Sequence, residues 1–242
     1  MSAIPNPFRP FPLEYEQRLD ARVLARFFNA VYAWMAAGLA VTAVVAWWVS
    51  TQPQLMARML GGPVIWILII AELALVFTVA NAVQRIGATA ATVLFLLYAA
   101  INGLTLSIIL LIYAKAVVAS AFLITAAMFG ATSLYGFVTR RNLMSLGGYL
   151  FMGLIGIVIA SFVSIFWHPT MLTVLINYLG VFLFIGLTAY DTQRLKWIAL
   201  QTQNDPALAA RLSVSGALAL YLDFLNLFLF LLSILGNNNR RD

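Results

Sequence analysis

Three of the eight acidic side chains in this sequence, Glu72, Asp191 and Asp223, fall inside long apolar stretches. Placing a carboxylate in the hydrocarbon core of a bilayer costs at least about 2.5–3.5 kcal/mol on insertion scales. A membrane protein that keeps such a residue usually turns it toward the bundle interior, where it binds or passes ions or protons. These three positions are therefore the first candidates for a functional site.

Asp191 and Asp223 are expected to face each other. They lie on either side of the connection near 194–212, so their helices should be antiparallel neighbours with the two acids at similar depth. Two carboxylates in contact at low dielectric cannot both ionise cheaply, so the pair should hold one proton between them. Such a pair senses pH, and once deprotonated it offers oxygen ligands to a hard cation such as Ca²⁺. Asn226, one turn beyond Asp223, could add another oxygen.

Each acid also has a purely structural interpretation. Asp191 could form a surface ion pair with Arg194, one turn away. No basic residue lies within a turn of Asp223, so its structural alternative is a buried hydrogen bond. Glu72 could be a protonated acid bonded to a neighbouring helix, or it could take part directly in ion passage.

These acids must be positioned by membrane-spanning helices. The 242 residues are 63% hydrophobic and 9% charged, whereas a soluble domain carries about 25% charged residues. A bilayer core requires about 20 apolar residues per helix. Seven stretches are long enough, near 28–50, 63–83, 89–113, 117–138, 146–166, 171–193 and 213–236. The sequence therefore predicts an all-α integral membrane protein with a seven-helix domain over residues 28–236.

The connections between these stretches carry turn and capping residues. Gln52-Pro53 and Gly61-Gly62-Pro63 bound a predicted first loop. Asp205 followed by Pro206 combines a favoured N-cap residue with proline at the first helical position, which predicts the start of the last helix. His168 is expected to be an ordinary residue of an outer turn.

The basic residues predict the orientation. Ten of the 14 Lys and Arg residues fall on one side when the N-terminus is placed inside, against four on the other. This asymmetry favours a cytoplasmic N-terminal tail over residues 1–27, which is too charged for a signal peptide, and an outer polar tail over residues 237–242. Six full spans with a re-entrant last segment, which would leave both ends inside, is the alternative. The expected location is the inner membrane of a bacterium.

The residues around the acids resemble one family. The segments Thr188–Arg194 and Leu220–Phe228 (LYLDFLNLF) closely resemble the last two helices of the Bax inhibitor-1 family, also called the transmembrane Bax-inhibitor-motif family. The segment from Arg140 through Gly148 resembles that family's link between its fourth and fifth helices. Glu72 stands where members often carry a glutamate in the second helix. The resemblance covers most of the chain from about residue 28.

The resemblance implies a fold and a mechanism. Members are similar to pH-dependent calcium leak channels in which six helices, in two layers of three, surround a central seventh. Two aspartates, here Asp191 and Asp223, form a hydrogen-bonded pair that would sense pH and bind Ca²⁺. A basic residue at the inner end of the second helix latches to the first aspartate. Arg85 is the residue available here, although it stands later than the family pattern leads one to expect.

The sequence also limits other function classes. It contains no cysteine for disulfides, thiolate metal sites or nucleophilic catalysis. The net charge of +6 comes from loop residues that topology explains, so no nucleic-acid partner is expected. Phosphate-binding loops, HExxH helices, nucleophile elbows and the GxGD pattern of intramembrane aspartyl proteases are missing, so we expect no enzyme and no resident cofactor.

Two other membrane functions stay open from the sequence. The chain could be an interaction protein that modulates a membrane protease or a stress response without transport, in which case the aspartates lock the fold. It could also be a proton-coupled transporter, which broken helices and inverted repeats would indicate. The partners expected in the main interpretation are the lipid bilayer, calcium ions and protons.

Overall fold

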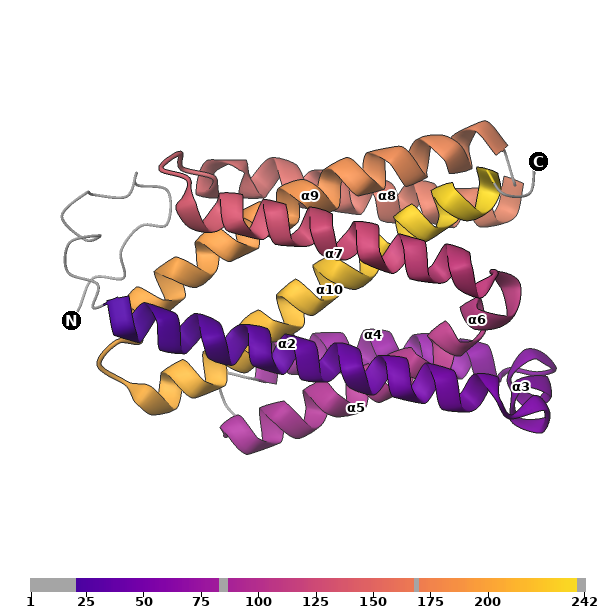
Figure 1. The fold of residues 1–242 in the computed structure, drawn as a ribbon, viewed down its shortest axis with the longest axis horizontal. Coiled ribbons are helices and arrows are strands. Elements are labelled where there is room, and N and C mark those ends of the chain that lie inside the picture. Colours follow the sequence, from indigo (N-terminus) through magenta and orange to yellow (C-terminus); the bar gives the residue numbers. More distant parts are fainter. Residues whose placement is uncertain (1–20, 83–86, 168–169, 239–242) are drawn as a thin grey trace. The chain divides into compact units, whose positions relative to one another are not determined.

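The computed structural model describes residues 21–82, 87–167 and 170–238, and these ranges are almost entirely helical, with no strand (Figure 1). The elements are α2 (Ala21–Ser50), α3 (Pro53–Leu60), α4 (Val64–Ala82), α5 (Ala88–Ser107), α6 (Ile109–Ile112), α7 (Lys115–Val138), the 3-10 turn η1 (Met144–Leu146), α8 (Gly147–Trp167), α9 (Thr170–Gln201) and α10 (Pro206–Asn238).

Six helical segments within the described ranges are long and apolar enough to cross a membrane. They are Ala21–Ser50, Ala88–Ile112, Lys115–Val138, Met144–Ser164, Met171–Gln201 and Pro206–Asn237. The seventh predicted stretch is present as α4, a helix of 19 residues whose described apolar run is Ile67–Val76. The predicted all-α membrane fold is therefore confirmed.

Two connections differ from the sequence prediction. The predicted first loop contains the amphipathic helix α3, whose Met56 and Met59 are buried with Val49. The connection expected near 194–212 is mostly helical, because α9 continues to Gln201 and α10 begins at Pro206. The predicted cap of α10 is confirmed, since the Leu208 backbone N–H donates to Asp205 Oδ1 at 2.9 Å.

The chain forms two compact units that share α10. The α7–α9 unit contains the described residues of 21–24, 121–201 and 222–238. The α2–α5 unit contains the described residues of 25–120 and 202–221. Helices in a bilayer associate through close van der Waals packing and hydrogen bonds, because lipid tails are as apolar as the side chains themselves. Each unit should therefore show its own tightly packed contacts.

Aromatic edge-to-face contacts supply much of this packing. In the α2–α5 unit, the Tyr221 ring meets Phe95 at a centroid distance of 5.5 Å and Tyr98 at 5.9 Å. In the α7–α9 unit, Phe224 meets both Phe122 and Phe129 at 5.5 Å. Such pairs contribute about 0.5–1.5 kcal/mol each beyond the area they bury.

Helix α10 is the most enclosed of the spans. Half of the residues in its most apolar 18-residue stretch are buried, whereas 6–33% are buried in the corresponding stretches of the other five spans. Its buried residues include Leu220, Tyr221, Leu227 and Leu232.

Candidate functional site

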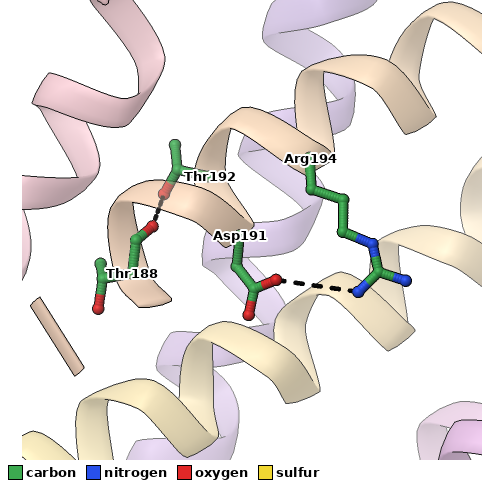
Figure 2. A network of polar contacts seen from close by, with 4 residues as sticks. All are labelled: Thr188, Asp191, Thr192 and Arg194. Carbon is green, nitrogen blue, oxygen red and sulfur yellow. Dashed lines mark hydrogen bonds and ion pairs between the residues drawn. The ribbon is translucent and has the colours of Figure 1, made fainter. Parts of the chain in front are cut away.

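The stretch of α9 that carries Asp191 is fixed against α7. Thr192 Oγ1 lies 3.0 Å from Ser133 Oγ of α7 and 2.8 Å from the Thr188 carbonyl oxygen of its own helix (Figure 2). Gly136 of α7 packs so closely on α9 that a Cβ atom there would overlap the Ala189 carbonyl oxygen. The two backbones therefore meet directly beside Asp191, and only glycine permits that approach.

The next turn of α9 holds the link between α7 and α8. Gln193, which is buried, donates from Nε2 to the Arg141 carbonyl oxygen at 2.8 Å and accepts from the Leu143 N–H at 2.7 Å. Lys196 Nζ donates to the Phe137 carbonyl oxygen at 2.9 Å, near the C-terminal end of α7 where carbonyl groups lack helical partners. These hydrogen bonds fix the part of α9 that carries Asp191 against α7 and the α7–α8 link.

Asp191 forms an ion pair within its own helix. Arg194 Nη1 lies 3.9 Å from Asp191 Oδ1, and Figure 2 shows this ion pair on successive turns of α9. The structural contact considered from the sequence is therefore present. The Arg194 side chain is 56% exposed and that of Asp191 is 15% exposed. A long ion pair with an exposed guanidinium contributes little stability, so it does not by itself explain why a carboxylate lies here.

The packing of α9 on α10 sets the register of the two aspartates. Asn177 Nδ2 donates to Ser233 Oγ at 2.7 Å, and the rings of Phe184 and Phe230 lie 5.8 Å apart. Two turns further along α9 from Phe184 comes Asp191, and two turns back along α10 from Phe230 comes Asp223. Because α9 and α10 run antiparallel, these equal offsets place Asp191 and Asp223 at corresponding positions along the two helices.

Asp223 is the buried member of this pair. Asp223 is only 4% exposed, and its Oδ2 atom has no hydrogen-bond partner among the described residues. Its neighbour Phe224 packs between two phenylalanines of α7, which keeps this part of α10 apolar. An unpaired buried carboxylate oxygen is costly, so this atom needs a proton, a water molecule or a cation.

The remaining ligand candidates are sparse. Asn226 donates from Nδ2 to the Leu222 carbonyl oxygen at 2.8 Å, so its Oδ1 is the atom that could serve a cation. No group of three or more His, Cys, Asp or Glu side chains with metal-binding geometry occurs in the part of the chain that the structure describes. Since Ca²⁺ takes 6–8 oxygen ligands, Asp191 and Asp223 would have to share it with water and neutral oxygens.

Glu72 lies in the α2–α5 unit and has a partner on the next helix. Thr105 Oγ1 of α5 donates to Glu72 Oε1 at 2.6 Å. The hydrogen bond to a neighbouring helix considered from the sequence is present, and a direct role in ion passage stays a prediction. Arg85, the predicted latch, lies outside the described residues, as does His168.

Sequence reasoning missed a second polar contact in the α2–α5 unit. The Tyr221 hydroxyl lies 2.7 Å from Thr42 Oγ1, which also donates to the Ala99 carbonyl oxygen at 2.9 Å. All three residues are buried, so α2, α5 and α10 are joined at one point. The available signal was a tyrosine and a threonine within long apolar helices, where a hydroxyl group requires a partner.

The fold and the paired acids define a class, that of multi-pass helical membrane proteins with ionisable residues in their spans. Residues 24–240 match the family described as inhibitor of apoptosis-promoting Bax1. This match covers most of the chain, and the protein belongs to this family, the Bax inhibitor-1 family that the two aspartate segments resemble.

Similar bacterial proteins support the assignment. The inner membrane protein YbhL of Escherichia coli K12 is 47% identical over 216 residues, which cover 88% of this chain and 92% of YbhL. An uncharacterized protein of Deinococcus radiodurans is 44% identical over 216 residues, 89% of this chain and 91% of its own. A third, from Borreliella burgdorferi, is 38% identical over 222 residues, 91% of this chain and 96% of its own.

Proposed function

We propose that this protein is a pH-sensitive calcium leak channel whose gate responds to the proton shared by Asp191 and Asp223. The observation that carries the proposal is the buried Asp223 carboxylate, whose Oδ2 has no hydrogen-bond partner in the described ranges. The register of α9 on α10 sets this carboxylate opposite Asp191. A structural aspartate would be expected to spend both oxygens on the protein.

The chemistry of the pair supports a response to pH. With one proton between them, the two carboxylates carry a single negative charge and can hydrogen-bond to each other. When that proton leaves, two negative charges face each other in an apolar part of the bundle. Mutual repulsion and the attraction of a divalent cation then both act on α9 and α10.

The sparse ligand set supports transport more than storage. Two carboxylates and one amide oxygen leave most positions around Ca²⁺ to water and neutral oxygens, which favours weak, reversible binding. A conducting site must bind an ion well enough to admit it and weakly enough to release it. The proposal includes no chemical step on a substrate and no resident cofactor.

Calcium flux into proteoliposomes tests this function. We expect uptake by the parent protein to change between pH 6 and pH 8, and we expect Asp191→Asn or Asp223→Asn to remove that change, because an amide cannot exchange the proton. Asp205→Asn is the matched control, since asparagine caps a helix as well as aspartate does and Asp205 is exposed at the start of α10.

Two outcomes would overturn the proposal. One is a parent protein that carries no Ca²⁺ above empty vesicles at any pH, which would favour the interaction protein whose aspartates stabilise the fold. The other is a pH response that survives in both variants, which would separate the sensor from the aspartate pair. Proton movement that requires a second solute would indicate a proton-coupled transporter.

A further inference from the structure

The turn between α7 and α8 carries two consecutive exposed arginines, Arg140 and Arg141. Exposed tyrosines stand on both sides of it, Tyr135 in the last turn of α7 and Tyr149 in the first turn of α8, at 50% and 76% exposure. Tyrosine favours the headgroup level of a bilayer, where its ring is apolar and its hydroxyl is wet. We therefore expect the two arginines to lie at the level of the lipid phosphates.

The backbone of this turn is held in one conformation. Besides the two hydrogen bonds that the turn forms with Gln193, the Arg141 N–H donates to Thr139 Oγ1 at 3.3 Å and the Met144 N–H donates to Asn142 Oδ1 at 3.0 Å. Ser145 Oγ donates to the Asn142 carbonyl oxygen at 3.0 Å. An ordinary topogenic loop needs only positive charge, whereas this one presents its arginines on an ordered frame. Preorganisation of that kind reduces the ordering cost of binding.

The charges around the turn are unbalanced. Neither Arg140 nor Arg141 forms an ion pair with a carboxylate in the described part of the chain, whereas Arg194 does. Lys196 adds a further positive charge beneath the turn, where it donates to the Phe137 carbonyl oxygen. Guanidinium groups bind phosphate oxygens in a bidentate manner, so the surface complements a phosphate diester.

We propose that the α7–α8 turn binds the headgroup of an anionic phospholipid, with Arg140 and Arg141 on the phosphate and Tyr135 and Tyr149 at headgroup depth. Gln193 acts as a positioning residue, because it fixes the backbone on which both arginines stand. The inference is independent of calcium transport, since it depends on the turn and not on Asp191 or Asp223.

Lipid titration of the purified protein in neutral detergent, followed by native mass spectrometry, tests the site. The probes are phosphatidylglycerol and phosphatidylcholine of the same chain length. We expect tighter binding of phosphatidylglycerol, reduced about fivefold for each arginine removed and about 25-fold in Arg140→Gln/Arg141→Gln. The matched control is Arg58→Gln/Lys115→Gln, which removes two exposed positive charges from α3 and from the opposite end of α7.

A second pair of variants separates position from charge. Gln193→Ala keeps every charge and should lower the preference for phosphatidylglycerol over phosphatidylcholine, a ratio that general destabilisation would leave unchanged. Arg140→Lys/Arg141→Lys should retain part of the affinity, because lysine supplies the charge without the bidentate geometry. Thermal melting in lipid-free detergent verifies that each variant is folded.

Three results would overturn the inference. Equal loss of phosphatidylglycerol in the control variant would show only a general charge effect. Equal binding of phosphatidylcholine, whose choline group balances the phosphate charge, would show that the turn does not select an anionic headgroup. Full displacement of the lipid by soluble glycerol phosphate would assign the turn to a free anion instead of the membrane.

Discussion

At the scale of single residues, the contrast between Asp191 and Asp223 is informative. Asp191 has the Arg194 guanidinium at 3.9 Å, and 15% of its side chain is exposed. Asp223 is 4% exposed, and one of its carboxylate oxygens has no partner among the described residues. Both acids could be found from the sequence, because a carboxylate in an apolar stretch stands out. Which of the two acids is the more buried depends on the helices that pack around each of them, and no local sequence pattern contains that information.

Arg194 should adjust the proposed sensor without being essential to it. Its positive charge favours the ionised form of Asp191, so removing that charge makes loss of the shared proton less favourable. We expect Arg194→Gln to move the midpoint of pH-dependent calcium uptake to higher pH, by about 0.5–1 pH unit for a partly exposed pair. Uptake at closely spaced pH values measures this, with Arg58→Gln as the control for loss of an exposed arginine. A midpoint that does not move would show that Arg194 has no influence on the pair.

At the scale of elements, the contact between α7 and α9 determines where Asp191 stands. Gly136 meets the backbone of α9, Ser133 meets a side-chain hydroxyl of α9, and Gln193 binds the link between α7 and α8; none of the three is charged. The sequence does not show which chain segment packs against Gly136. A glycine within a helix shows that something approaches closely, and the approaching chain is set only by the tertiary fold.

A pair of glycines on α7 tests this contact. Gly136→Ala places a Cβ atom against the Ala189 carbonyl oxygen and should destabilise the protein by about 1–3 kcal/mol. Gly130 lies on the same helix, and a Cβ atom added there would meet nothing within 4 Å. Gly130→Ala should therefore be neutral or stabilise by up to about 1 kcal/mol, because alanine is the better helix former. The apparent melting temperature in one detergent measures both, and equal values would mean that α7 and α9 do not meet at Gly136.

At the scale of the whole molecule, hydropathy locates the spans well and the connections less well. The seven predicted stretches all coincide with helices, because about 20 apolar residues have few alternatives to a membrane helix. The predicted end of α9 comes too early, since the last turns of this helix contain Arg194 and Lys196 and resemble a polar loop. Lys196 is nevertheless buried and bonded to the α7 backbone, a contact between residues far apart in sequence. Likewise, the hydroxyl groups of Thr42 and Tyr221 meet only in the fold.

The topology of the chain gives the last prediction. Helix α10 is continuous over 33 residues, or about 50 Å at 1.5 Å per residue, which exceeds the about 30 Å of a bilayer core. Its length favours a full span over a re-entrant segment.

With the N-terminus inside, seven spans place Ser145 on the cytoplasmic side and Thr51 and Asn237 on the other. Because the chain has no cysteine, single substitutions of these exposed residues by cysteine can be labelled without background. We expect a membrane-impermeant maleimide added to intact cells to label Thr51→Cys and Asn237→Cys but not Ser145→Cys. Protection of Asn237→Cys alone would establish the re-entrant alternative, and labelling of Ser145→Cys alone would invert the orientation.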